Sequence, residues 1–282
     1  MNRFYKTCAD RLLAPMAPVP TPMAPEGGPA HPVLAVLFDI YGTLLVSAAG
    51  DTGQQTQHPR TGPLLQKSLA GSGILLPPID IHQALVREIE NAHAQQKAGG
   101  IDFPEIEIDR LWQKVLNTDD LQAARSAAFA HEIITNPVWP MPGLNDLLKK
   151  IEQKKLAAGI VSNAQFYTPL LFEYFFGQVP EASWAAPDLV FYSYRHGLAK
   201  PSPVLFDLAA CALEKRGILP NQTLFVGNDM KKDMAPARAA GFQTVLFAGD
   251  ARSLRLYPSD PCCANLCPDM VITDLAQLAD VL

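Results

Sequence analysis

The chain has 282 residues, of which 48% are hydrophobic, and its net charge at neutral pH is −5. This length allows one large domain or two smaller ones, each with a sizeable core. The mildly acidic balance gives no reason to expect a nucleic-acid partner. No apolar stretch is long enough to span a bilayer, and residues 1–13 lack the apolar core of a signal peptide. We therefore expect a cytoplasmic protein with no membrane or nucleic-acid partner, in an oligomeric state that the sequence leaves open.

The N-terminal region is dominated by proline. Seven prolines fall within residues 14–32, mostly with alanine between them. Proline at this density is excluded from helix interiors and from central strands. We predict that residues 1–31 form a mostly extended tail outside the folded body. Such a tail serves as a linker or plain extension more often than as a ligand for a proline-binding domain.

The first apolar run, Val33–Phe38, ends at Asp39. Runs of this length are typical of buried strands. Ligands of open parallel sheets bind beyond the carboxyl ends of the strands, which is where Asp39 would lie. A carboxylate in that place can act as a nucleophile, as a metal ligand or as a buried structural acid.

A long helical segment follows. Residues 47–62 are polar and rich in Gly, Thr and Gln, which predicts a linker or loop. Beyond them, apolar residues recur at helical spacing at Ile81, Leu85 and Ile89, and residues 121–134 are rich in alanine. No strand-like alternation occurs between residues 64 and 135. We predict that residues 49–140 form a helical insertion.

From residue 142 onward, helices and strands alternate. Helical stripes are followed by short apolar runs, which lie at residues 156–161, 223–226, 244–247 and 270–273. This alternation predicts a parallel sheet with helices on both faces. The predicted fold class is α/β, with a Rossmann-like core built from residues 32–48 and 141–282.

Five cysteines are present, and an odd number in a protein expected in the cytoplasm argues against a disulfide framework. The cluster of Cys262, Cys263 and Cys267 would suit a zinc or iron–sulfur site. No second pair of Cys or His residues supplies the missing ligands, so a surface loop is the favoured interpretation. We expect Cys211, on the apolar stripe of a predicted helix, to lie in the core.

Polar residues follow the predicted strands in a distinctive order. Asp39 ends the first run, Ser162 and Asn163 end the second, Lys200 comes next, and Asp229 and Asp233 follow the run at 223–226. Acid, hydroxyl, lysine and paired acids in this order resemble the four motifs of the haloacid dehalogenase (HAD) superfamily of hydrolases. The resemblance covers residues 33–275, and it implies a Rossmann-like core with an inserted helical cap.

The resemblance also implies a chemistry. Asp39 would attack the substrate and form a covalent aspartyl intermediate that water then hydrolyses. Lys200 would offset the negative charge that gathers around a phosphoryl group. Asp39, Asp229 and Asp233 would hold Mg²⁺, which prefers carboxylate oxygens. A simpler alternative is that Lys200 is a solvated loop cation and that Asp229 caps a helix, with Asp233 in its first turn.

Three further residues complete the predicted site. Ser162 would donate a hydrogen bond to a transferring oxygen, and Asn163 would do the same or fix its loop. Both count as catalytic and substrate-binding candidates, together with Lys200. Thr43 would brace the turn after Asp39 and contact the substrate. The alternative for Ser162 and Asn163 is a cap on the following helix.

Two departures from the superfamily pattern bear on the reaction. Most phosphatases of the superfamily carry a second acid where this chain has Tyr41, which we count among the catalytic candidates although its phenol, with a pKa near ~10, is a poor general base. Tyr41 together with the Ser-Asn pair is similar to the L-2-haloacid dehalogenases, in which halide leaves without a proton. Those enzymes lack the metal and have a depleted acidic motif, whereas Asp229 and Asp233 remain here. Asn228 stands where phosphatases often have the first acid.

We therefore predict a HAD-like hydrolase, a magnesium-dependent phosphatase acting on a small phosphorylated metabolite. A metal-free 2-haloacid dehalogenase is the first alternative. The second is a protein that binds a ligand on this fold with little or no catalysis. The sequence does not identify the substrate, because the cap that selects it follows no readable code.

Overall fold

A seven-stranded, mostly parallel sheet forms the centre of the protein. The computed structural model describes residues 1–50 and 61–282. The strand order is β1-β9-β8-β7-β2-β5-β6, and only β1 runs antiparallel to its neighbour. The strands are β1 (Glu26–Gly27), β2 (Ala35–Phe38), β5 (Ala157–Ser162), β6 (Val190–Tyr192), β7 (Thr223–Gly227), β8 (Gln243–Phe247) and β9 (Met270–Ile272). The predicted α/β class is confirmed.

Strand β2 lies in the middle of the sheet, where both faces are covered. Val36 and Phe38 point into one apolar cluster, which includes residues of α6 (Leu144–Gln153), α7 (Thr168–Phe176) and α11 (Leu275–Val281). Ala35 and Leu37 point into the other, which includes residues of α9 (Val204–Lys215) and α10 (Ala235–Ala239). A strand buried on both faces reads as a continuous apolar run, as this one does.

The parallel register brings three strand ends together. Phe38 of β2 is level with Ile160 of β5 and with Val226 of β7. The residues that follow these positions therefore meet at one edge of the sheet, as the rule for parallel sheets predicts. A short helix, α8 (Ser193–His196), follows β6 near the same edge.

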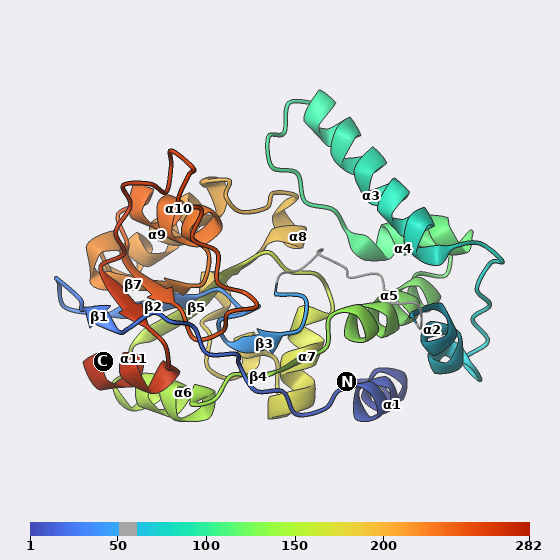
Figure 1. Cartoon of the computed structure of the whole chain (residues 1–282), viewed down its shortest axis with the longest axis horizontal. Helices are drawn as coiled ribbons and strands as arrows, with labels where there is room; N and C mark the ends of the chain where they lie inside the picture. The colour runs from blue at the N-terminus through green and yellow to red at the C-terminus, as the bar shows by residue number, and fades with distance from the viewer. Residues whose placement is uncertain (51–60) are drawn as a thin grey trace.

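The insertion is helical in its described part. It contains α2 (Thr61–Leu69), α3 (Ile81–Ala98), α4 (Ile108–Leu116) and α5 (Leu121–Thr135), which form a separate lobe beside the core (Figure 1). The side chains of Asp80 and Asp120 accept backbone N–H groups at the starts of α3 and α5, as N-cap acids do. Residues 51–60, most of the predicted linker, lie outside the described residues.

A paired ribbon joins the two lobes. Strand β3 (Leu45–Ser47) enters the insertion, and β4 (Val138–Pro140) leaves it, and the two pair antiparallel. Ser47 Oγ donates a hydrogen bond to Asn136 Oδ1 over 2.7 Å. The sequence did not predict this ribbon, because both strands are only three residues long.

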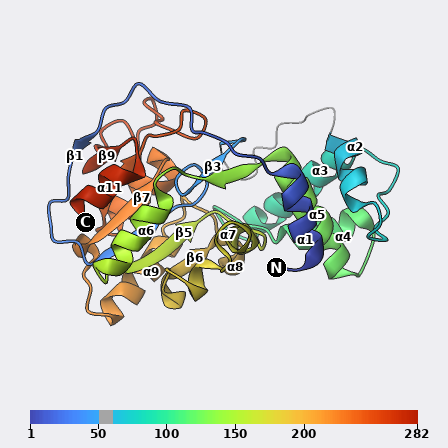
Figure 2. The ribbon, with the colours of Figure 1, turned by 90° about the horizontal axis from the view of Figure 1, so that it is seen from below.

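The prediction of an extended tail is wrong for the first part of the N-terminal region. Residues Arg3–Leu12 form helix α1, and Asn2 caps it by accepting the N–H of Tyr5. Tyr5, Cys8 and Ala9 are buried, at the i, i+3, i+4 spacing of one helix face. The Tyr5 ring lies 4.9 Å from that of Phe129 in α5, centroid to centroid, and Figure 2 shows the two helices side by side. The prolines begin only after this helix, so they do not prevent it.

The proline-rich part is extended, but it lies against the core. The Val19 N–H donates to Asp250 Oδ1 over 3.1 Å, and Thr21 Oγ1 donates to the carbonyl of Ala248 over 2.6 Å. Further along, β1 pairs with β9. Figure 2 shows the segment running from α1 beside the cap to β1 at the far edge of the sheet. The N-terminal region therefore contacts both lobes.

The cysteines are free, and one prediction about them is wrong. Cys211 is exposed, because the buried face of α9 is formed by Leu205, Phe206, Ala209 and Leu213. Cys262 and Cys263 lie in the loop before β9, with their sulfurs 3.3 Å apart. They and the Asp260 carboxylate have donor atoms within 4.8 Å of one another, and Cys267 is not in that group. No helix among the described residues is long and apolar enough to cross a membrane.

Candidate active site

Asp39 is held at the carboxyl end of β2 by the strand beside it. Its backbone N–H donates to the carbonyl of Val226 over 2.9 Å, and its side chain is 7% exposed. The chain then turns sharply, with three successive N–H groups donating to the Ile40 carbonyl. Gly42 has φ of +81°, and a Cβ there would lie 2.4 Å or less from the side chains of Ser253 and Asn228. The Gly is therefore required both for the turn and for the close packing around Asp39.

Lys200 is a buried cation between two carboxylates. Its Nζ donates to Asp39 Oδ1 over 2.7 Å and also to Asp233 Oδ1. Burial lowers the pKa of Lys200, but the charges of Asp233 and Asp39 outweigh it, so the pKa is raised overall. The side chain is therefore a charged ammonium, only 4% exposed, and the alternative of a solvated loop cation does not hold.

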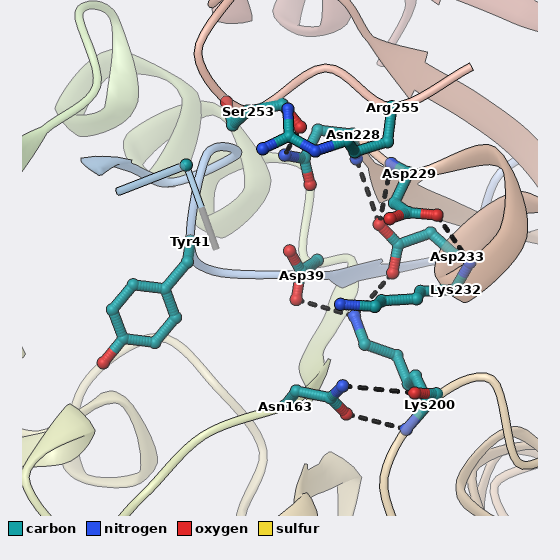
Figure 3. A pocket seen from close by; sticks show the side chains of 11 residues that line it. Asp39, Tyr41, Asn163, Lys200, Asn228, Asp229, Lys232, Asp233, Ser253 and Arg255 are labelled. Carbon is teal, nitrogen blue, oxygen red and sulfur yellow. Dashed lines mark hydrogen bonds and ion pairs between the residues drawn. The ribbon is translucent and has the colours of Figure 1, made fainter. Parts of the chain in front are cut away.

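Asn163 and Ser162 hold the two reactive groups in place. Asn163 Oδ1 accepts the backbone N–H of Lys200 over 2.7 Å, and its Nδ2 donates to the Lys200 carbonyl over 3.2 Å (Figure 3). Ser162 Oγ donates to Asp39 Oδ1 over 2.8 Å. Both residues therefore position Asp39 and Lys200, and their contact with a substrate stays a prediction.

Asp233 acts as an internal anchor in this structure. Its Oδ2 accepts the backbone N–H groups of Asn228 and Asp229, each over 3.1 Å, while Oδ1 accepts Lys200. Burial raises its pKa to about 7, an effect that Lys200 opposes and the charge of Asp39 reinforces. These three hydrogen bonds fix Lys200 and the backbone after β7. The predicted role of Asp233 as a metal ligand stays a prediction.

Asp229 caps the turn that follows β7. Its Oδ1 accepts the N–H groups of Lys231 and Lys232 over 2.8 and 2.7 Å, at the start of the helical turn Met230–Met234. Tyr257 donates its hydroxyl to Oδ2 over 3.1 Å. Burial raises the pKa of Asp229, and these backbone hydrogen bonds oppose that rise. The N-cap alternative that the sequence offered matches these contacts.

Asn228 occupies the position where phosphatases of the superfamily often have an acid, and its contacts need an amide. Its Nδ2 donates to the backbone carbonyl of Ser253 over 2.8 Å, a contact that an ionised carboxylate cannot make because it has no donor. Its Oδ1 accepts a long hydrogen bond from Thr43 Oγ1, at 3.5 Å. In Figure 3 this amide oxygen points towards Asp39. Thr43 therefore contacts the site wall, and its predicted contact with substrate is untested.

Tyr41 points away from the reacting carboxylate (Figure 3). Its hydroxyl lies 2.9 Å from Thr168 Oγ1, in a buried position. Burial first, and then the negative charge of Glu132, raise the pKa of Tyr41 well above its ordinary value. The phenol therefore does not point at the Asp39 carboxylate in this structure, and a catalytic role of Tyr41 stays a prediction.

These residues enclose a small cavity of about 20 Å³. Its lining is polar and charged, with Asn163 and Ser253 beside three carboxylates and three cations, namely Asp39, Asp229, Asp233, Lys200, Lys232 and Arg255. Sequence reasoning missed Lys232, Ser253 and Arg255. The last two lie in the loop after β8, and the position of that loop at the same sheet edge was the one available signal.

The cavity also offers oxygen donors for a metal. Asp39, Asn228 and Asp229 all line it, and carboxylate and amide oxygens are the ligands that Mg²⁺ prefers. Asp39 is the best placed of the three, because both of its hydrogen bonds within the described residues use Oδ1. The donor set therefore fits a hard divalent cation, and the predicted roles of Asp229 and Asp233 as its ligands stay predictions.

Comparisons with curated proteins find partial matches to two phosphatases. The chain is 33% identical over 94 residues to a ribulose-1,5-bisphosphate 5-phosphatase of Halopiger xanaduensis, a match that covers 33% of this chain and 38% of that protein. It is 37% identical over 90 residues to a phosphoserine phosphatase of Thermus thermophilus, covering 32% of each chain. The chain thus spans about a third of the length of these curated relatives.

Among solved structures, a 2-haloacid dehalogenase from Pseudomonas syringae pv. Tomato DC3000 has the same fold. The TM-score is 0.58 at 20% identity, and the match covers 88% of this chain and 97% of that one. A family model described as haloacid dehalogenase-like hydrolase matches residues 33–241. That range includes every predicted site residue from Asp39 to Asp233, and the chain belongs to the haloacid dehalogenase-like hydrolases.

Proposed function

We propose that the protein is a magnesium-dependent phosphatase that acts on a small substrate through a covalent aspartyl intermediate. The observation that carries this proposal is the lining of the cavity beside Asp39, which holds three cations, three carboxylates and several polar groups. The cations and polar groups suit the several oxygens of a dianionic phosphoryl group, and the carboxylates suit Mg²⁺, whereas a 2-haloacid offers only its carboxylate to the same lining. The two partial matches to phosphatases support the same choice.

The reaction begins at the carboxylate of Asp39. Ser162 and Lys200 both donate to Oδ1, which fixes the orientation of this carboxylate. A carboxylate oxygen forms a bond to phosphorus while the bond from phosphorus to the leaving oxygen breaks, which gives an aspartyl phosphate. Water then attacks that phosphorus, and the bond from phosphorus to the aspartyl oxygen breaks. The carboxylate is regenerated, and inorganic phosphate leaves with one proton of the water while the other passes to solvent. Lys200 offsets the charge that gathers in both steps.

The metal would add positive charge in the same place. Asp39 and Asn228, with Asp229 nearby, would hold Mg²⁺, and the ion supplies electrostatic stabilisation of phosphoryl oxygens when it is bound. Asp233 contributes indirectly, because it holds Lys200 against Asp39.

The position of Tyr41 restricts the leaving group. No acid at that position faces Asp39, so a leaving alkoxide would receive no proton from it. The carboxylate, enolate or phenolate released from an acyl, enol or phenyl phosphate leaves well without a proton. We therefore propose these phosphates as the preferred substrate class. Alkyl phosphates should react slowly.

The same observation favours a second candidate. Halide also leaves without a proton, so a buried and averted Tyr41 suits a metal-free 2-haloacid dehalogenase equally well. The third candidate, a ligand-binding protein without efficient turnover, would follow if neither reaction occurs.

One assay separates the three. Release of phosphate from acetyl phosphate and p-nitrophenyl phosphate is measured with magnesium and with a chelator, and release of halide is measured from 2-chloropropionate. Asp39→Asn serves as the inactive control. Phosphate release that needs magnesium and Asp39 supports the proposal. Halide release that persists with the chelator, without phosphate release, overturns it in favour of the dehalogenase.

A further inference from the structure

Arg255 is a cation of the active-site cavity that no acid neutralises within residues 1–50 and 61–282. It lines the same cavity as Asp39 and is half-buried. Its Nη1 donates to the carbonyls of Arg252 and Leu254, over 2.8 and 3.1 Å. These contacts orient the guanidinium without offsetting its charge. The other buried cation, Lys200, by contrast touches two carboxylates.

The backbone of Arg255 is fixed to the catalytic edge of the sheet. Its N–H donates to the carbonyl of Asn228 over 3.0 Å, and the N–H of Met230 donates to its carbonyl over 2.9 Å. The carbonyl of Ser253, two residues earlier, accepts the amide of Asn228. Hydrogen bonds therefore hold the backbone of Arg255 against the residues that follow β7. Figure 3 shows Lys200 on one side of Asp39 and Arg255 on the other.

We propose that Arg255 binds a second anionic group of the substrate, a carboxylate, while the first reacts at Asp39. This inference rests on the proposed function and names its substrate class. A guanidinium presents two parallel N–H donors that match the two oxygens of a carboxylate. Lys200 already serves the reacting group, so Arg255 adds recognition of the rest of the substrate.

The shared cavity limits the distance between the two anions. Asp39 and Arg255 line the same small cavity, so the carboxylate must lie close to the reacting phosphoryl group. The substrate class that this arrangement favours is a short-chain phosphorylated carboxylic acid. Charge recognition at this point also discriminates strongly against neutral analogues, because their binding would leave a guanidinium desolvated and unneutralised.

Binding of non-reacting phosphonates tests the proposal without turnover. Phosphonoacetate carries both anions, and methylphosphonate carries the phosphonate alone. Isothermal titration of each is compared in the wild type, Arg255→Gln, Arg255→Lys and Arg110→Gln, the last being an exposed arginine of the cap that removes the same charge. We expect Arg255→Gln to weaken phosphonoacetate about tenfold or more, a loss of ~1.4 kcal/mol, and methylphosphonate much less. Arg255→Lys should lie between, and Arg110→Gln should match the wild type.

Three outcomes overturn the proposal. Equal losses for both phosphonates in Arg255→Gln would assign Arg255 to the phosphoryl group. Unchanged binding of phosphonoacetate in both Arg255 variants would remove it from the substrate, and a wild type that binds neither phosphonate would do the same. If Arg255→Gln fails to fold by thermal melting, the Arg255→Lys comparison decides. The proposed phosphatase activity fails separately, through an absence of phosphate release while the phosphonate discrimination remains.

Discussion

Replacing Tyr5 by alanine should destabilise the protein strongly, although Tyr5 lies ahead of the proline-rich segment. The side chain is buried, its ring packs against Phe129 of the cap, and its hydroxyl accepts Gln122 Nε2 over 3.0 Å. Truncation of a buried aromatic side chain to alanine typically costs about 3–5 kcal/mol. Because the hydroxyl is already near the surface of α5, we take the lower end, ~3 kcal/mol. For a chain of this size that corresponds to a fall in Tm of roughly 6–12 °C.

The matched control is Lys6→Ala, one residue further along the same helix. Lys6 is exposed, and its ion pair with Asp10 lies at the surface, where such pairs add little to stability. Alanine preserves the helix in both variants. Thermal melting by circular dichroism should therefore separate them clearly. Equal melting temperatures for Tyr5→Ala and wild type would refute the packing of α1 on the cap, and would restore the idea of a detached tail.

Three further predictions concern the site and its pH response. Asp39→Asn keeps size and hydrogen bonding but is not a nucleophile, so turnover should vanish with an unchanged far-ultraviolet spectrum; wild-type rates would remove Asp39 from the mechanism. Gly227→Ala would place a Cβ 2.5 Å from Asp233 Oδ2, so the carboxylate that holds Lys200 must move and kcat should fall ~10²-fold; an unaltered kcat would contradict that arrangement. Burial lowers the pKa of His131 to about 3, below its ordinary value of about 6.5, so only the unfolded chain binds the proton between those values and stability falls with falling pH. Between pH 7 and pH 5, the free energy of unfolding measured in urea should fall by about 2 kcal/mol less in His131→Phe than in the wild type. An identical pH dependence of this free energy in the two proteins would disprove the role of His131.

The strands that position the site follow directly from sequence. Residues 35–38 and 224–226 are buried on both faces of the sheet and are all apolar, and this leaves an unambiguous pattern. Helix α1 was missed for the opposite reason. Its apolar stripe has only three buried residues and is followed by prolines that suggest an extended chain. What stabilises it is a partner surface on α5, far away in the sequence.

The site divides in the same way. Asp39 could be identified because it ends a predicted strand, and Lys200 because its place in the chain resembles the order of the superfamily motifs. The structure brings the two side chains within 2.7 Å. The competition for Asp229 between helix capping and metal binding could not be decided from sequence, since both roles need the same carboxylate. Arg255 had no local signal at all. It becomes a site residue only because the loop after β8 pairs with Asn228.

The role of Tyr41 can be tested first by removing its hydroxyl. That group contacts Thr168 and points away from Asp39. Tyr41→Phe should therefore keep nearly the full rate and lose only about 1 kcal/mol of stability, the net worth of one hydrogen bond. Rates are measured with acetyl phosphate and 2-chloropropionate. A loss of turnover in Tyr41→Phe would mean that the phenol acts on the substrate after all.

Tyr41→Asp then makes opposite forecasts for the two enzyme classes. In a phosphatase, a carboxyl group at this position would stand where most relatives of this kind carry a general acid, and its shorter side chain is free of the contact with Thr168. General acid catalysis typically raises a rate roughly 10²–10⁴-fold, so the rate of alkyl phosphate hydrolysis should rise. The rate with acyl phosphates should change little, because their carboxylate leaving group needs no proton. In a dehalogenase the same substitution adds negative charge beside Asp39 and should slow halide release. Matched rates on alkyl phosphate, acetyl phosphate and 2-chloropropionate therefore assign the class from one variant. If none of the three rates changes, residue 41 does not reach the leaving group. A preference for substrates whose leaving group needs no proton must then have another cause.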